Sequence, residues 1–131
     1  MITMEHRPKS VKATRVILVD DQPLYLDLAK TLLSRDPRVT VVGEATTVKT
    51  AVLMIKKLEP DLVMLDVHMP DMNGFEAARI LLASNPGLRL ILTSSQNEPE
   101  YHYLATTVGA LGFITKKELT AEAVIRMLEQ N

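Results

Sequence analysis

The chain alternates five times between a short apolar run and a segment in which apolar residues recur with helical spacing. The short runs are rich in Val, Ile and Leu, which is typical of strands buried on both faces of a sheet. They cover 15–19 (RVILV), 39–45 (VTVVGEA), 61–66 (DLVMLD), 88–94 (LRLILTS) and 110–115 (ALGFIT). Strands that alternate with helices in this way predict an α/β fold, a doubly wound parallel sheet with helices on both faces.

The segments between these runs carry apolar residues three and four positions apart, so that one side of each predicted helix is apolar. Pro23 suits the first turn of the first helix, where its fixed backbone angle and missing N–H are tolerated. The residues that set the helical spacing are Leu24, Leu28 and Leu32 beside Tyr25, Ala29 and Leu33; Val48, Ala51, Val52 and Ile55; Phe75, Ala78 and Leu82; Tyr101, Leu104, Ala105 and Val108; and Ala121, Val124, Ile125 and Leu128.

A chain of 131 residues is long enough for one domain with its own core. We expect residues 1–14 to form a polar leader and residues 15–131 to form this domain. The absence of cysteine excludes disulfides and thiolate metal sites. The net charge is -1 without a basic cluster, so the domain is not expected to bind nucleic acid itself. No apolar run reaches the roughly 18 residues of a membrane helix, and no signal peptide is visible, which predicts a cytoplasmic protein.

Polar side chains gather where the predicted strands end. The first run is followed by Asp20 and Asp21, the third ends in Asp66, and the fifth is followed by Lys116. The fourth ends in two hydroxyl residues, 93–94. In an open parallel sheet the carboxyl ends of the strands form one edge, and ligands bind there near the switch in strand order. We therefore expect the acids, the lysine and a hydroxyl to converge on one site.

Three carboxylates at one edge need a nearby cation. Two carboxylates about 4 Å apart repel by about 4 kcal/mol at an effective dielectric constant near 20. A divalent ion together with Lys116 would balance Asp20, Asp21 and Asp66, and an all-oxygen ligand set is the one that Mg²⁺ prefers. The alternative is that Asp20 or Asp21 caps the first helix, since Asp is a good N-cap. Capping alone leaves the convergence with the other two charged residues unexplained.

Asp66 is the acid best placed for chemistry. It ends an apolar strand, and the loop that follows it is stiffened by Pro70 and turned by Asn73 and Gly74. A carboxylate beside a metal and a lysine can accept a phosphoryl group, because both cations neutralise the transferring oxygens. The residues thus predict an acyl phosphate on Asp66.

Four motifs together carry a family resemblance. They are ILVDDQP (17–23), LVMLDVHMPDMNG (62–74), ILTSS (91–95) and GALGFITK (109–116). In this order, at the strand ends, they resemble the receiver domain of bacterial two-component response regulators, and the details are most similar to the NarL/FixJ/LuxR-like subfamily. The resemblance covers about residues 15 to 129. It implies a flavodoxin-like (βα)5 fold with the strand order 2-1-3-4-5.

The resemblance also implies a site. Asp66 corresponds to the phosphorylated aspartate, and a sensor histidine kinase, a histidine phosphotransfer protein or a small phosphodonor such as acetyl phosphate supplies the phosphoryl group. Asp20 and Asp21 correspond to the acidic pair that holds Mg²⁺ (or Mn²⁺) with Asp66. The backbone carbonyl of His68 completes this metal shell, and Lys116 corresponds to the family lysine.

Two further residues correspond to the conformational switch of the family. The family places its switch hydroxyl at a set distance before the glycine that matches Gly109, so the resemblance implies Ser94 as this hydroxyl and leaves Thr93 to pack in the core. Phe113 corresponds to the switch aromatic, although a plain core Phe would give the same pattern. The side chain at His68 is expected to face solvent, and its position, like that of Gln96, tunes the lifetime of the phosphoryl group in the family.

The resemblance leaves two outputs open. Subfamily members continue into a DNA-binding domain that controls transcription; the alternative is a free-standing single-domain regulator that acts by protein–protein interaction or phosphorelay. A homodimer on phosphorylation is expected through residues 108–113 and the last helix. The domain itself is expected to be a phosphoacceptor that catalyses its own phosphorylation and dephosphorylation, not an enzyme with a turnover substrate.

Competing functions fit the residues less well. An aspartate-nucleophile phosphatase needs a second Asp two residues after the nucleophile as general acid, and that position is His68. A nucleotide-binding domain needs a glycine-rich phosphate loop, whereas the segment 39–45 offers one glycine. A degenerate receiver that keeps only the fold is disfavoured because every acid and the lysine are present.

Overall fold

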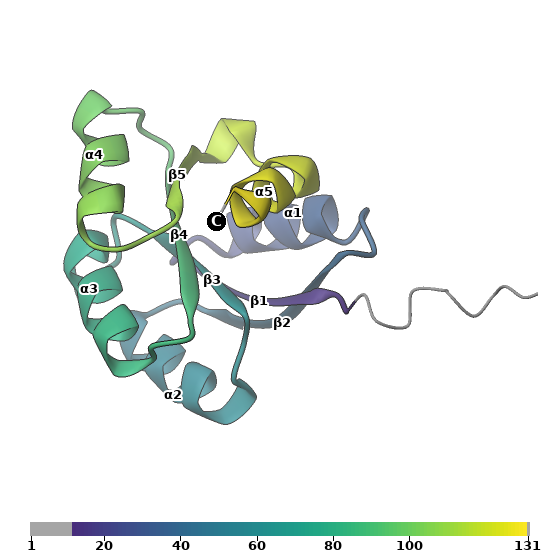
Figure 1. Cartoon of the computed structure of the whole chain (residues 1–131), viewed down its shortest axis with the longest axis horizontal. Coiled ribbons are helices and arrows are strands. Elements are labelled where there is room, and N and C mark those ends of the chain that lie inside the picture. Colours follow the sequence, from purple (N-terminus) through teal and green to yellow (C-terminus); the bar gives the residue numbers. More distant parts are fainter. Residues whose placement is uncertain (1–11, 131) are drawn as a thin grey trace, which may run out of the picture.

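The structure is a computed structural model, and it describes residues 12–130. Five parallel strands form one sheet in the order β2-β1-β3-β4-β5, which confirms the predicted fold class and strand order (Figure 1). The strands are β1 (Thr14–Val19), β2 (Val39–Ala45), β3 (Leu62–Asp66), β4 (Arg89–Ser94) and β5 (Gly112–Thr115). The helices are α1 (Pro23–Leu33), α2 (Val48–Leu58), α3 (Gly74–Ser84), α4 (Pro99–Thr107) and α5 (Ala121–Glu129), with a short 3-10 helix at Lys116–Glu118.

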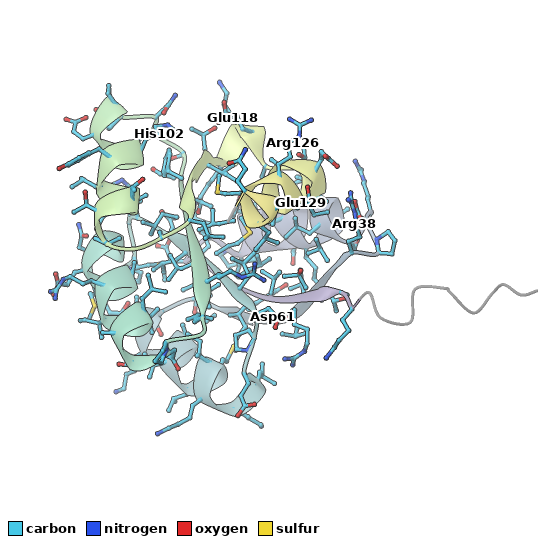
Figure 2. All side chains as sticks on the ribbon, viewed as in Figure 1. Arg38, Asp61, His102, Glu118, Arg126 and Glu129 are labelled. Atoms are coloured by element: carbon cyan, nitrogen blue, oxygen red, sulfur yellow. The ribbon has the colours of Figure 1, made fainter. Side chains whose placement is uncertain are left out.

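The predicted leader, residues 1–14, lies mostly outside the described residues, and its last residue, Thr14, already belongs to β1. Among residues 12–130, every helix is too short or too polar to span a bilayer. Arg38, labelled in Figure 2, joins the start of β2 to α5 because its guanidinium lies 2.7 Å from Asp36 and 3.1 Å from Glu122.

Helices cover both faces of the sheet (Figure 1). Side chains of α2, α3 and α4, such as Ile55, Leu81 and Ala105, pack on one face with the strand residues Ile17 and Val63. Those of α1 and α5 pack on the other face, where Leu33, Val124 and Leu128 contact Val16 and Met64. The central strands are therefore sealed from water on both sides, and the chemistry of the molecule is confined to the strand ends.

The sequence pattern overstated burial in two places. Leu24 and Leu28 are 84% and 53% exposed, because α1 turns its other side, with Leu26 and Ala29, to the sheet. β2 is an edge strand that pairs with β1 alone, so its residues 40–44 are exposed or half-buried instead of buried on both faces. Apolar periodicity finds the helix and the strand, but it does not reveal which apolar row meets the core.

The point where the strand order reverses lies between β1 and β3. The chain runs from β1 outward to β2 and then returns to the other side of β1, so that β1 and β3 become neighbours. Helices leave these two strands toward opposite faces, and the space outside their carboxyl ends is open to a ligand.

Candidate functional site at the acidic edge

Asp20 and Asp66 stand at the carboxyl ends of the two central strands β1 and β3. Both are buried, with 2% and 4% of their surface exposed, whereas Asp21 beside them is exposed. The backbone N–H of Asp20 donates to the carbonyl of Ala45 (3.0 Å), which carries the β1–β2 pairing one residue past the strand. The fold thus brings the predicted acids together at one edge.

Lys116 joins the two buried acids. It begins the 3-10 helix after β5, and its Nζ lies 2.7 Å from Oδ2 of Asp20 and 2.9 Å from Oδ2 of Asp66. The same ammonium donates to Oε1 of Gln22 (3.1 Å) and lies 4.4 Å from the ring centroid of Tyr25. The lysine is held by four groups, so its charge is fixed between the carboxylates.

Burial and charge shift the pKa values of this cluster. Burial raises the pKa of Asp20 to about 6, although contact with Lys116 and the N–H of Gln22 act in the opposite direction. Burial also acts to lower the pKa of Lys116, but its contacts with Asp20 and Asp66 outweigh this effect and raise the pKa. The pKa of Tyr25 is raised by burial and by the two nearby carboxylates. One lysine is therefore insufficient to neutralise the acidic edge.

The acidic edge fits a bound cation. One carboxylate oxygen from each of Asp20, Asp21 and Asp66 can be chosen so that the three lie within 4.8 Å of one another. Oδ2 of Asp20 is buried and faces Nζ of Lys116 at 2.7 Å, and no second partner for this oxygen lies among the described residues. Three carboxylates against one lysine leave a charge of about -2, and oxygen donors favour a hard divalent ion.

The capping alternative for Asp20 and Asp21 is wrong. The N-cap of α1 is Gln22, and no side chain caps this helix. Oδ1 of Asp20 instead accepts the N–H of Gln22 (2.9 Å), which fixes the turn between β1 and α1. This turn holds the carboxylate at the strand end and leaves Oδ2 for the lysine or a metal.

The loop after β3 holds Asp66 from the other side. Oδ1 of Asp66 accepts the backbone N–H of His68 (2.9 Å), while Oδ2 faces Lys116. The loop then returns onto the strand, because the N–H of Gly74 donates to the carbonyl of Val67 (2.7 Å) and Asn73 caps α3. A Cβ on Gly74 would lie 2.5 Å from the carbonyl oxygen of Asp66, so only glycine fits here.

The two hydroxyl residues at the end of β4 are both buried and, as neighbours in a strand, face opposite sides of the sheet. Thr93 faces the α1 side, where it lines a narrow cavity with Tyr25 and Met64. Ser94 is fully buried, and its Oγ accepts the N–H of Gln96 (3.0 Å). The choice of Ser94 over Thr93 as the hydroxyl that binds a phosphoryl group stays a prediction.

Phe113 lies inside the protein and is 4% exposed. Its ring meets those of Tyr101 (5.4 Å between centroids) and His102 (5.0 Å), both from α4, and Figure 2 labels His102 on that helix. His68 is exposed as expected, and its Nε2 lies 3.2 Å from the hydroxyl of Tyr101. The switch role of Phe113 and the metal contact of the His68 carbonyl remain predictions.

Sequence reasoning missed four residues of the site. Gln22 and Tyr25 surround the lysine, Tyr101 contacts the loop of Asp66, and Asp71 fastens that loop to α2. The carboxylate of Asp71 accepts the N–H groups of Val48 and Lys49, both at 3.0 Å. An acid between Pro and Asn in a short loop is a signal for such a helix-end contact, but its partner lies 22 or 23 residues away.

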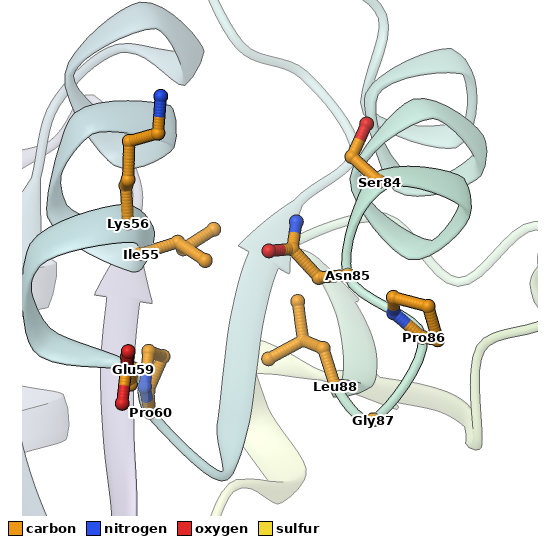
Figure 3. Close-up of a pocket in the computed structure, with 9 residues that line it drawn as sticks. All are labelled: Ile55, Lys56, Glu59, Pro60, Ser84, Asn85, Pro86, Gly87 and Leu88. Atoms are coloured by element: carbon orange, nitrogen blue, oxygen red, sulfur yellow. The ribbon is translucent and has the colours of Figure 1, made fainter.

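A pocket of about 380 Å³ lies at the opposite, amino edge of the sheet (Figure 3). Lys56 and Glu59 line it from the end of α2, and Asn85 and Gly87 line it from the loop after α3. It contains none of the acidic cluster, so the chemistry of the chain and this hollow are separate features.

Known proteins resemble this chain in both sequence and fold. Residues 16–129 match the response regulator receiver domain. The nitrate/nitrite response regulator protein NarL of Escherichia coli K12 is 34% identical over 88% of this chain and 53% of its own length. A protein-glutamate methylesterase/protein-glutamine glutaminase of Methanospirillum hungatei is 33% identical over 78% of this chain, which is 30% of that enzyme.

Among solved structures, the signal receiver domain of the response regulator NarL from Mycobacterium tuberculosis superposes with a TM-score of 0.81 at 33% identity. That match covers 92% of this chain and 99% of the other. The chain spans about half the length of the NarL relative, so the comparisons concern one domain. On this evidence the chain belongs to the receiver domain family of two-component response regulators, of the NarL/LuxR type.

Proposed function

We propose that Asp66 accepts a phosphoryl group and that the phosphorylated domain relays a signal to an output. The observation that carries this proposal is the pair formed by Asp66 and Lys116, with 2.9 Å between Oδ2 and Nζ, inside a buried acidic cluster. A nucleophilic carboxylate beside a fixed cation is suited to phosphoryl transfer, because the cation stabilises the charge on the transferring oxygens.

In the proposed reaction, a carboxylate oxygen of Asp66 bonds to phosphorus. The donor is a phosphohistidine of a sensor kinase or phosphotransfer protein, or a small molecule such as acetyl phosphate. The phosphorus–nitrogen bond of phosphohistidine, or the phosphorus–oxygen bond of acetyl phosphate, breaks and the leaving group keeps the electron pair. Lys116 and the backbone N–H of His68 hold the Asp66 carboxylate in place for this attack.

Asp20, Asp21 and Asp66, with the backbone carbonyl of His68, would hold Mg²⁺ or Mn²⁺. When bound, the ion supplies positive charge that neutralises the oxygens of the phosphoryl group. The three carboxylates within reach of one another, two of which share Lys116, support this assignment. The ion also removes the repulsion that one lysine leaves between the acids.

We expect phosphorylation to change the structure first at the ends of β4 and β5. We assign to Ser94 a new hydrogen bond from its hydroxyl to a phosphoryl oxygen, and the segment that Ser94 holds, through Gln96, leads directly into α4. Phe113 packs against Tyr101 and His102 of the same helix, so a shift of α4 must change the packing around Phe113. A phosphoryl group that binds one packing better than the other shifts the population toward it.

We infer the output of this receiver domain from the relatives that contain such a domain. NarL of Mycobacterium tuberculosis and DegU of Brevibacillus brevis are named transcriptional regulatory proteins, and this chain matches about half of each (53% and 48%), which supports a DNA-binding output in a longer protein. A free-standing cytoplasmic regulator is the second candidate. The receiver itself is proposed to act as a phosphoacceptor without a turnover substrate, although methylesterase relatives join it to an enzyme.

A homodimer on phosphorylation, through residues 108–113 and the last helix, remains part of the proposal. Ala110 and Phe113 are buried in the monomer, as are Val124 and Leu128 of α5. These side chains belong to the core, so a dimer would have to use the exposed residues around them.

The experiment is phosphoryl uptake from ³²P-labelled acetyl phosphate. We expect wild type to take up label in Mg²⁺, Asp66→Asn to take up none, and excess chelator to abolish uptake by wild type. Asp61→Asn, the same change at the opposite edge, is the matched control and should label normally. Labelling of Asp66→Asn at the wild-type level would contradict the proposal that Asp66 is the phosphoacceptor. Full labelling in excess chelator would contradict the proposed role of the metal ion.

A further inference from the structure

Tyr101, in the first turn of α4, contacts both loops that border the acidic edge. Its hydroxyl lies 3.2 Å from Nε2 of His68, in the loop after β3, and 3.5 Å from Oε1 of Gln96, in the loop after β4. The first contact is a hydrogen bond of ordinary length and the second is a long one. A single hydroxyl therefore links α4 to the two segments on which the site is built.

The two partners of this hydroxyl are themselves bonded to the site. The backbone N–H of His68 donates to Oδ1 of Asp66 (2.9 Å), and that of Gln96 donates to Oγ of Ser94 (3.0 Å). Tyr101 is thus one residue removed from the proposed phosphoacceptor on one side and from the proposed switch hydroxyl on the other.

The ring of Tyr101 is fixed by aromatic contacts. Its centroid lies 5.4 Å from that of Phe75 and 5.4 Å from that of Phe113, and it packs half-buried against the core. Such edge and tilted contacts hold an aromatic ring in one orientation. The hydroxyl is consequently a fixed point, whereas the side chains of His68 and Gln96 are exposed, and the ring of His68 also meets that of Tyr101 edge-on (6.1 Å between centroids).

We propose that Tyr101 is a positioning residue whose hydroxyl holds the side chains of His68 and Gln96 at the rim of the acidic edge, and so restricts the approach of water to phosphorylated Asp66. This inference rests on the proposed function. In the hydrolysis concerned, a water oxygen bonds to phosphorus and the bond to the Asp66 oxygen breaks. The carboxylate leaves with the electron pair, and the products are the free carboxylate and inorganic phosphate, which keeps one proton of the water and releases the other to solvent.

The test compares lifetimes of the phosphorylated protein. Wild type, Tyr101→Phe and Tyr103→Phe are labelled with ³²P-acetyl phosphate in Mg²⁺, the donor is removed, and the loss of label is followed. Tyr101→Phe keeps the ring and its packing and loses only the hydroxyl, so we expect label to be lost about 3- to 10-fold faster, the effect of about one hydrogen bond. Tyr103 lies on the same helix and is 72% exposed, so Tyr103→Phe should match wild type.

A second comparison separates positioning from a general loosening of α4. In a His68→Ala, Gln96→Ala background, the hydroxyl has no partner left to hold, and adding Tyr101→Phe should leave the lifetime unchanged. A Tyr101→Phe lifetime equal to that of wild type would overturn the proposal, as would an undiminished effect in the double-alanine background. Failure of wild type to take up label would instead contradict the proposed function. The experiment therefore distinguishes a failure of the Tyr101 proposal from a failure of the phosphoacceptor proposal.

Discussion

The two edges of the sheet use charge in opposite ways. At the amino edge, Arg15 and Asp61 form a closed set of contacts: the N–H of Arg15 donates to Oδ2 of Asp61 (2.8 Å), and its guanidinium donates to the carbonyls of Leu58 and Glu59 at the end of α2 (both 2.9 Å). At the carboxyl edge, the buried Asp20 and Asp66 compete for one lysine. At the amino edge the charged side chains of Arg15 and Asp61 are satisfied by backbone groups, whereas the carboxyl edge keeps a surplus of negative charge.

This difference separates stability from function within one small domain. Hydrogen bonds between charged side chains and the backbone at the amino edge fasten α2 and β3 to β1, and the hollow beside them in Figure 3 contains no acidic cluster. The surplus of negative charge at the carboxyl edge lowers the stability of the fold, because like charges are held close together and out of water. A protein keeps such an arrangement where a cation or phosphoryl group is to bind.

The sharpest contrast between the edges is predicted for two glycines. Gly74 packs against the backbone of Asp66 and Val67, and a Cβ there would lie 2.5 Å from backbone atoms that cannot move without shifting the end of β3. We expect Gly74→Ala to lower the free energy of unfolding by about 3 kcal/mol, the upper range for overpacking. Urea denaturation followed by circular dichroism measures this change.

Gly87 is the matched control from the amino edge. A Cβ there would have nothing within 4 Å, and the residue lies in the open loop after α3. We expect Gly87→Ala to leave stability unchanged or to raise it by about 0.5 kcal/mol, because alanine has less freedom in the unfolded chain. Equal effects of the two substitutions would show that the carboxyl edge is no more tightly built than the amino edge.

The fold was predictable because it depends on patterns that span many residues. Five apolar runs and five helical segments specify a two-faced parallel sheet, and the order of the strands came from the family resemblance of the motifs. The convergence of Asp20, Asp66 and Lys116 was predictable as well, since each follows directly from the end of a strand. Strand ends in a parallel sheet have only one edge to share.

The rest of the site depends on loop conformation, which periodicity does not encode. The contacts of Tyr101 with His68 and of Asp71 with the start of α2 join residues that are far apart in sequence and are brought together by turns. The same limit explains the exposed row of leucines on α1, because the side that faces the sheet is chosen by packing against α5 and the strands. Contacts between loops require the structure itself.

Removing one carboxylate charge should change the stability in opposite directions at the two edges. In excess chelator, Asp20→Asn should raise the free energy of unfolding by about 1 to 2 kcal/mol, since it removes one of two buried like charges and keeps the oxygen that accepts the N–H of Gln22. Asp61→Asn at the amino edge should lower it by about 0.5 kcal/mol, because a charge-assisted hydrogen bond becomes a neutral one.

Adding Mg²⁺ should make wild type more stable than Asp20→Asn, the reverse of their order in chelator. A ligand at 100 times its dissociation constant stabilises the folded state by about 2.7 kcal/mol, and wild type should gain this while Asp20→Asn gains little. Chemical denaturation of wild type, Asp20→Asn and Asp61→Asn, each in chelator and in Mg²⁺, gives the free energies of unfolding. A wild type that is more stable than Asp20→Asn in chelator would contradict the idea that this edge gives up stability.

The smallest effect is predicted for Asp71, an acid of the carboxyl edge whose hydrogen bonds are satisfied as those of Asp61 are. Hydrogen bonds from the N–H groups of Val48 and Lys49 hold its pKa below the usual range, in contrast to the raised pKa of Asp20. A lowered pKa means that the unfolded chain takes up the proton first. The stability that the Asp71 carboxylate contributes is therefore fully present above about pH 4 and is lost as the pH falls through the lower folded value.

Asp71→Asn isolates this contribution, because asparagine does not titrate and can still accept one of the two hydrogen bonds. We expect a loss of about 0.5 kcal/mol at pH 6, where an exposed contact is screened by solvent, and a difference from wild type that shrinks as the pH is lowered toward 3. Urea titrations of both proteins at pH 6, 4 and 3 measure it. A difference that grows on acidification would mean that Asp71 is destabilised in its charged form, as Asp20 is, and that charge at this edge is in surplus in the loop as well as in the buried cluster.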